Sequence, residues 1–286
     1  MQFSDKILEL AREAEVALAP IFARVDEISF ENTKKIMDAF REHRVSEPLF
    51  AATSGYGYDD RGREVLDRVW ADVMGAEAAF VRHSIANGTH ALTIGLFGLL
   101  RPGDILFSIA GKPYDTLDEV IGNVGEAGNG SLRDFGVKYD QIDYSGDDIN
   151  LDALEKKLRE DDTIKVVFIQ RSKGYATRPT FSVSQIGELI SFIKGIKPDV
   201  ICMVDNCYGE FVEKIEPSDV GADMIVGSLI KNPGGGLAPI GGYICGTKEC
   251  VEQCAYRLSA PGLGQEVGAN LGIIQSMYQG FFLAPT

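Results

Sequence analysis

The sequence lacks the features that would place the protein in a membrane or on nucleic acid. No apolar run approaches the roughly 20 residues that a helix needs to span a bilayer. The first residues, MQFSDKILELAREAE, are charged and amphipathic, which is not typical of a secretory signal peptide. Positive charge is also scarce, because 28 lysine and arginine residues stand against 42 acidic ones and give a net charge of −14. This balance argues against nucleic acid and anionic membranes as partners.

Cysteine is scarce as well. The chain has five cysteines, an odd number with irregular spacing, which indicates a reducing compartment such as the cytoplasm. Cys250 and Cys254 are one helical turn apart and could form a metal pair, but no CxxC motif and no neighbouring histidine supports one. Because free cysteine is usually buried, we expect both residues to be structural and predict no metal site.

The order of apolar segments predicts an α/β fold. Helical periodicity runs through residues 4–44, with a second helix expected over residues 31–43, and a polar loop follows at residues 46–60. From residue 62 onward, helices alternate with short runs rich in valine and isoleucine. Such runs are typical of a mainly parallel sheet with helices on both faces. The expected strands are AEAAFVRHS, DILFSIA, GVKYDQIDY, IKVVFIQ, VICMVDN, DMIVGSLIKN and PIGGYICG.

An open parallel sheet binds ligands at the carboxyl ends of its strands, so the residues just after each strand are candidates. Residues 83–90 follow the first strand and open a helix, whose free N–H groups could hold a phosphate near Gly88 and Thr89. An ordinary capped turn has the same pattern, and the Walker A and GxGxxG spacings are missing. Tyr114 follows DILFSIA, where it would either stack on a flat cofactor or simply precede a helix.

Two further positions place charge at the end of apolar strands. Asp205 ends VICMVDN and is either a cap of the next turn or an anion that faces a cationic ligand atom. Lys231 lies between an apolar strand and a glycine-rich turn. Alone it could be an exposed turn lysine, but burial there would favour the neutral amine that forms Schiff bases. Phosphate anchor, aromatic, aspartate and lysine together follow the order that pyridoxal phosphate (PLP) requires.

These positions lie in motifs that resemble those of the fold-type I PLP enzymes of cysteine and methionine metabolism. Within that group the chain is most similar to the aluminium resistance protein or methionine gamma-lyase-like branch, which is related to cystathionine beta-lyases. The resemblance runs along essentially the whole chain and implies the large domain of the aspartate aminotransferase-like fold. The matching segments are TSGYGYDDRGRE, HSIANGTHAL, GKPYDTLDEVIG, VDNCYGEF and SLIKNPGGGLAPIGGYI.

The resemblance implies pyridoxal 5'-phosphate as the cofactor and a role for each residue that would hold it. Lys231 resembles the lysine that forms the Schiff base, and Asp205 resembles the carboxylate that pairs with the protonated pyridine nitrogen. Gly88 and Thr89 resemble backbone donors to the phosphate, which the hydroxyl of Ser228 would assist.

The resemblance also assigns the aromatic residues. Tyr114 resembles the residue that stacks on the cofactor ring. Tyr56, Tyr58 and Arg61 resemble a Tyr-x-Arg element that reaches the phosphate of a neighbouring subunit. This element implies a homodimer or a homotetramer.

The sequence departs from the family pattern in two places. Cys207 stands where related lyases usually have threonine, and the chain stops at FFLAPT, where family members continue into a smaller domain that carries an arginine for the substrate carboxylate. We therefore expect residues 1–60 to form an N-terminal helical segment and loop, residues 61–286 to form the PLP-binding large domain, and the C-terminal small domain to be absent. We also expect apolar surface to be exposed around Phe281, Phe282 and Leu283.

The function that the resemblance implies is a PLP-dependent carbon–sulfur lyase acting on a small sulfur-containing amino acid, of the cystathionine beta-lyase or methionine gamma-lyase type. One alternative is another PLP reaction at the α-carbon, such as transamination or racemisation. A non-catalytic PLP-binding scaffold is the other.

Overall fold

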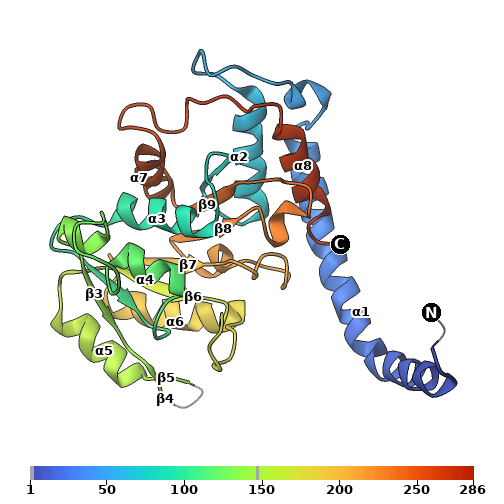
Figure 1. Cartoon of the computed structure of the whole chain (residues 1–286), viewed down its shortest axis with the longest axis horizontal. Helices are drawn as coiled ribbons and strands as arrows, with labels where there is room; N and C mark the ends of the chain where they lie inside the picture. The colour runs from blue at the N-terminus through green and yellow to red at the C-terminus, as the bar shows by residue number, and fades with distance from the viewer. Residues whose placement is uncertain (1–2, 146–147) are drawn as a thin grey trace.

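A mixed sheet forms the centre of the computed structural model, which describes residues 3–145 and 148–286. The strands are β1 (Ala78–Arg82), β2 (Ile105–Ser108), β3 (Lys138–Gln141), β6 (Ile164–Gln170), β7 (Ile201–Asp205), β8 (Met224–Ser228) and β9 (Gly242–Gly246). They follow the order β1-β9-β8-β7-β6-β2-β3 (Figure 1). The strands from β8 to β3 pair in parallel, and β9 runs antiparallel to both of its neighbours. The predicted mainly parallel sheet is confirmed. A separate two-stranded sheet pairs β4 (Tyr144–Ser145) with β5 (Asp148–Ile149).

Helices cover both faces of this sheet, because its strands are apolar on both sides. The helices are α1 (Asp5–Glu42), α2 (Arg61–Val73), α3 (Gly88–Leu99), α4 (Asp115–Ile121), α5 (Leu151–Glu160), α6 (Val183–Ile196), α7 (Lys248–Leu258) and α8 (Ile274–Leu283). Helices α3, α4 and α7 share one buried cluster with Met203 of β7. Helices α2, α5, α6 and α8 share the other with Cys202 and Val204, the neighbours of Met203 along the strand.

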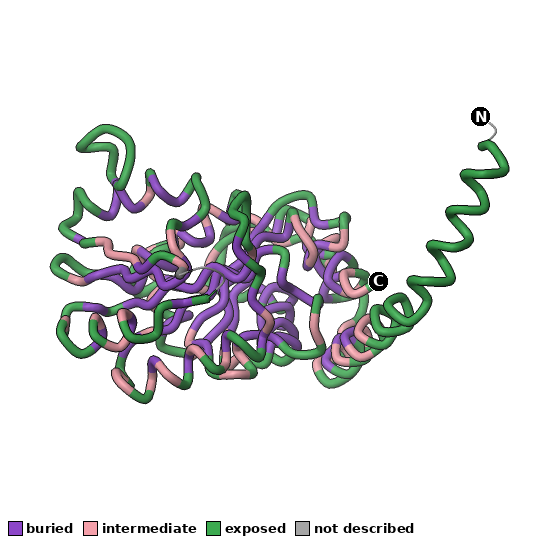
Figure 2. Tube along the Cα trace, turned by 90° about the horizontal axis from the view of Figure 1, so that it is seen from below, coloured by how far each residue is buried: buried purple, intermediate pink, exposed green. Residues whose placement is uncertain are grey.

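The N-terminal region is one continuous helix, so the prediction of a second helix starting near residue 31 was wrong. No glycine or proline lies between Pro20 and the end of α1, and nothing interrupts the helical pattern there. The C-terminal part of α1 buries Ile36 and Ala39 against the body, whereas its N-terminal part is exposed and projects away from it (Figure 2). Although α1 is long, no helix within residues 3–145 and 148–286 is also apolar enough to cross a membrane.

The last described helix, α8, closes the core beside α2. Phe281 is fully buried and stacks on Trp70, with ring centroids 4.1 Å apart. Phe282 is half-buried, and Leu283 keeps 43% of its surface exposed. The expectation that this end exposes a continuous apolar surface was therefore wrong for Phe281, because the segment forms a helix whose aromatic face packs inward.

Candidate active site

A cavity of about 160 Å³ lies at the carboxyl edge of the sheet, where β7 and β8 end and where α3 and α4 begin. Parallel sheets of this kind bind ligands at the carboxyl edge, so this cavity is the candidate site. Residues far apart in the sequence meet there. Five of the predicted residues line the cavity, namely Gly88, Thr89, Tyr114, Asp205 and Lys231.

Lys231 enters the cavity from a tight turn after β8. The turn continues into a short 3-10 helix, η4 (Asn232–Gly234), and needs glycine, because a Cβ at Gly234 would lie 1.7 Å from the Leu229 carbonyl oxygen. The Lys231 side chain is half-buried, and its Nζ lies 4.1 Å from the centroid of the Tyr208 ring. Among the described residues, no carboxylate oxygen lies within ion-pair distance of this amine. The Lys231 amine is thus not taken up by an ion pair within the described residues and is available to a ligand in the cavity.

Asp205 ends β7 and is buried. Its Oδ1 accepts a hydrogen bond from the Cys207 N–H at 3.1 Å, so the side chain does cap the next turn. Burial raises the pKa of the Asp205 carboxyl, while the Cys207 N–H and the positive charge of Lys231 lower it. A carboxylate in this position gains stability from a cationic ligand atom, because it has little solvent to stabilise its charge.

The N-terminus of α3 forms the opposite wall of the cavity. Asn87 caps the helix by accepting a hydrogen bond from the His90 N–H at 2.9 Å. The N–H groups of Gly88 and Thr89 have no acceptor in the described part of the chain, so they are available to an anion. A Cβ at Gly88 would lie 3.3 Å from Sγ of Cys207 and 3.5 Å from the Cβ of Ser228, so a larger residue there would crowd this wall. Ser228 itself is buried behind this wall and does not line the cavity.

Tyr114 stands at the start of α4 and is held from two sides. Its backbone N–H donates to Oε1 of Gln170 at 2.6 Å, and its ring stacks on Tyr175 with centroids 5.7 Å apart. The segment after β6 passes close to this ring, because a Cβ at Gly174 would lie 3.4 Å from it. The ring is therefore fixed at the rim of the cavity.

Tyr56, Tyr58 and Arg61 do not line this cavity. Tyr56 and Tyr58 belong to the loop before α2, which is the blue loop at the top of Figure 1, and Arg61 is the first residue of that helix. Tyr56 is 99% exposed, and Tyr58 and Arg61 are exposed as well. Their contact with the phosphate of a neighbouring subunit remains a prediction.

A family model described as methionine gamma-lyase matches residues 7–286. The chain belongs to this family. YnbB of Bacillus subtilis (strain 168), a protein of uncharacterised function, is 51% identical over 282 residues, which cover 98% of this chain and 66% of YnbB. A crystal structure from Listeria innocua, of a candidate cystathionine beta-lyase involved in aluminum resistance, is 50% identical with a TM-score of 0.95 and covers 100% of this chain and 69% of its own. A carbon-sulfur lyase involved in aluminum resistance from Clostridium novyi NT is 49% identical with the same TM-score, at 99% and 67% coverage.

The methionine gamma-lyase family implies PLP as the cofactor, and the cavity residues fit that group. The PLP-dependent protein YhfS of Escherichia coli shares the fold, with a TM-score of 0.68 at 17% identity over 91% of this chain and 64% of its own. The free N–H groups at Gly88 and Thr89 suit a phosphate, and the buried carboxyl of Asp205 suits a cationic ring nitrogen. Lys231 provides the only lysine amine among the residues that line this cavity.

Sequence reasoning missed Tyr208, which lies beneath the Lys231 amine. Its position inside the motif VDNCYGEF was the available signal, but its left-handed backbone, with a φ of 69°, is not visible in the sequence. Thr116, Ser172 and Gly174 also line the cavity. Thr116 places its hydroxyl 2.6 Å from that of Thr89, which holds the Thr89 side chain at the start of α3.

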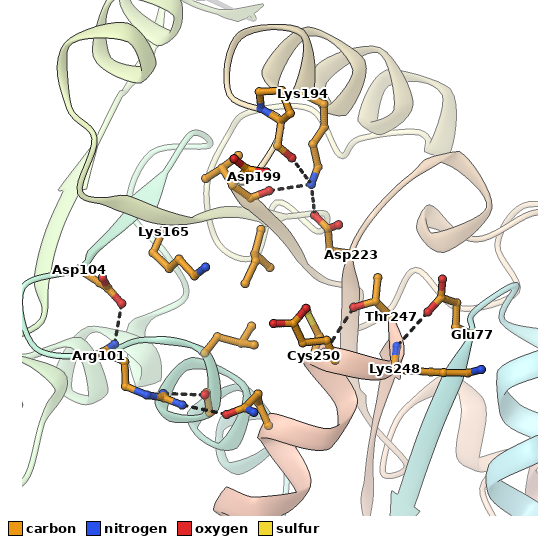
Figure 3. A pocket seen from close by; sticks show the side chains of 17 residues that line it. Glu77, Arg101, Asp104, Lys165, Lys194, Asp199, Asp223, Thr247, Lys248 and Cys250 are labelled. Atoms are coloured by element: carbon orange, nitrogen blue, oxygen red, sulfur yellow. Dashed lines mark hydrogen bonds and ion pairs between the residues drawn. The ribbon is translucent and has the colours of Figure 1, made fainter.

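A second cavity, of about 850 Å³, lies at the amino edge of the sheet (Figure 3). Side chains of both charges line it, namely lysines, an arginine and carboxylates. Several are already paired, as Lys194 is with Asp223 at 2.8 Å. It contains none of the predicted residues. Its larger volume therefore does not make it the better candidate, because parallel sheets of this kind bind ligands at the opposite edge.

Proposed function

We propose that the chain binds pyridoxal 5'-phosphate and acts as the large domain of a carbon–sulfur lyase for sulfur-containing amino acids. The observation that supports this most is the convergence of Lys231, Asp205 and the N-terminus of α3 on one cavity. Membership of the methionine gamma-lyase family and the 49% identity to a carbon-sulfur lyase point to the same chemistry.

Each residue in the cavity would have a separate task. The bound cofactor would supply an electron-accepting ring that stabilises negative charge at the substrate α-carbon. Lys231 would hold the cofactor covalently, and its Nζ, once released by the substrate, would take the α-proton. Asp205 would maintain positive charge on the ring nitrogen, and Gly88 and Thr89 would bind the phosphate with help from Ser228.

Other parts of the proposed enzyme lie outside this cavity. We propose that Tyr56, Tyr58 and Arg61 reach a neighbouring subunit, since they are exposed and do not line the cavity of their own chain. We also propose that the substrate carboxylate is bound by a smaller domain in the full-length relatives. The chain spans 66% of the length of YnbB, which leaves room for such a domain in that protein.

A product assay tests the lyase proposal. The PLP-loaded chain should release thiol, 2-oxo acid and ammonia in equal amounts from a thioether amino acid. Lys231→Ala should abolish this release, whereas Lys165→Ala, in the cavity at the opposite edge, should not. Transfer of the amino group without thiol would indicate transamination, and loss of optical activity alone would indicate racemisation. Bound cofactor without turnover, in this chain and in full-length YnbB alike, would indicate a scaffold.

A further inference from the structure

Five buried polar side chains lie next to the Asp205 turn but outside the cavity lining, and the proposed chemistry does not use them. We call them the Glu210 network. Its members come from the end of β6, from the segment after β7 and from β9. They are Arg171, Asn206, Glu210, Glu216 and Tyr243. Buried polar groups destabilise a fold unless they are hydrogen bonded. The hydrogen-bond partners of these five side chains therefore show which segments the network holds in place.

The network surrounds a strained turn at residues 206–211. Tyr208 and Phe211 both have left-handed backbone, with φ of 69° and 62°. Non-glycine residues keep this conformation only where their surroundings hold it. One support comes from Asn232, the neighbour of Lys231, whose Nδ2 donates to the Tyr208 carbonyl at 3.2 Å. The turn that presents Tyr208 is thereby tied to the turn that presents Lys231.

Arg171, just after β6, supports the same turn. Its Nη1 donates to the Gly209 carbonyl and to Oδ1 of Asn206, both at 2.8 Å. The fit is close, because a Cβ at Gly209 would lie 2.6 Å from the arginine. The guanidinium also pairs with Glu213 at 2.8 Å and with Glu216 at 3.5 Å, so Arg171 serves these two carboxyls and not Glu210.

Glu210 is held in a different way. Its Oε1 accepts a hydrogen bond from the Tyr243 hydroxyl at 2.8 Å, and its Oε2 is buried without a partner among the described residues. The pair packs flat on β8, where a Cβ at Gly227 would lie 2.5 Å from Glu210 and 2.6 Å from the tyrosine hydroxyl. Gly227 precedes Ser228, so the pair lies directly behind the proposed phosphate-binding wall.

The surroundings of Glu210 favour its protonated form. Burial raises the pKa of Glu210 to about 8, and the negative charges of Glu216 and Asp205 add to the effect of burial. The titratable groups that face it are Asp205 and Cys207 on its own segment, Glu216 before β8 and Tyr243 on β9. Burial raises the pKa of the Cys207 thiol, the negative charge of Glu210 raises it further, and the positive charge of Lys231 lowers it. Cys207 therefore lies close enough to both Glu210 and Lys231 to be affected by each charge.

We propose that Glu210 is a positioning residue for the Lys231 cavity. Its neutral carboxyl anchors the strained turn to Tyr243, and its ionisation places a second buried negative charge beside Asp205. Only the expected effect of Glu210 on cofactor binding rests on the proposed function. The contact between Glu210 and Tyr243 exists in the cofactor-free chain as well.

The first experiment uses the cofactor-free chain. Lys231 is labelled with trinitrobenzenesulfonate at pH 7 and pH 9, and its modification is followed by peptide mapping in the wild type and in Glu210→Gln. At pH 7 the two rates should agree, because glutamine mimics the neutral acid. At pH 9 a group with a pKa of about 8 is about 90% ionised. The wild type should then react at least about twofold more slowly than the variant, because a second buried charge disturbs the turn that holds Tyr208 beneath the amine. Identical pH profiles would overturn the proposal.

The second experiment measures equilibrium binding of PLP at pH 7. Glu210→Gln should bind like the wild type, whereas Glu210→Ala and Tyr243→Phe should bind at least about tenfold more weakly, because each leaves a buried group unpaired and loosens the turn. Glu249→Gln, on the exposed surface of α7, is the matched control. Wild-type affinity in both Glu210→Ala and Tyr243→Phe would contradict the anchoring role. If the wild type binds no PLP, the proposed function fails, and the labelling result still decides the role of Glu210.

Discussion

Replacing Asp205 with asparagine separates the charge of this side chain from its shape. Asparagine keeps an oxygen that can accept from the Cys207 N–H, so the turn should be retained. The negative charge is lost, and breaking a buried ion pair costs about 3–5 kcal/mol. If the charge stabilises a cationic ring nitrogen during the reaction, lyase turnover should fall by about 10²- to 10⁴-fold. Binding of PLP should persist, because the phosphate and Lys231 contacts remain.

The same substitution should have the opposite effect on the cofactor-free fold. Burial raises the pKa of Asp205 above its ordinary value of 3.8. A carboxyl with a raised pKa stabilises the fold fully only below pH 3.8, and this contribution is lost as the pH rises through the raised value. Asp205→Asn should therefore unfold at a higher temperature than the wild type at pH 7, with little difference near pH 3.5. Thermal unfolding across this range, beside turnover assays, measures both effects. Full activity would refute the charge role, and a less stable variant at pH 7 would refute the burial argument.

Three further predictions address the cofactor linkage, the subunit contact and the core. Borohydride reduction of the PLP-loaded chain should place the pyridoxyl group on Lys231, and a label on another lysine would exclude the assignment. Mixed oligomers of Arg61→Ala and Lys231→Ala should recover part of the activity if Arg61 serves a neighbouring subunit, whereas no recovery at any ratio would favour sites within one chain. Phe281→Ala should lower the free energy of unfolding by about 3–5 kcal/mol in urea titrations, because Phe281 is fully buried against Trp70. Leu283→Ala, at a position that is 43% exposed, should have a much smaller effect, and equal effects would contradict the packing of α8.

The sheet and the centre of the site could be predicted because both depend on local patterns. Each buried strand is a short apolar run, and the residue that follows such a run is placed at the ligand-binding edge by topology. This rule, applied to Asp205, Lys231, Gly88 and Tyr114, selected residues that the structure brings to one cavity.

The remaining features depend on tertiary contacts that no local pattern records. The segment that forms α8 contains glycine and ends near proline, so its helical character depends on packing of Phe281 against Trp70. The left-handed backbone of Tyr208 follows from contacts with distant elements, such as the bond from Asn232 to its carbonyl. The pairing of Glu210 with Tyr243 joins residues 33 positions apart, and neither residue shows from its neighbours that it will be buried.

The buried charges connect the stability of this fold to occupancy of the site. Asp205 and Glu210 are both buried carboxyls whose pKa burial raises, and Arg171 pairs with Glu213 and Glu216 rather than with either of them. The cofactor-free chain therefore bears the cost of an acidic cluster next to a strained turn. A ligand with a cationic atom at Asp205 reduces that cost, and any ligand that binds only the folded state also stabilises it by mass action. Tight packing alone would not require a buried carboxyl at the end of β7, so the placement of Asp205 is better explained by a ligand than by the core.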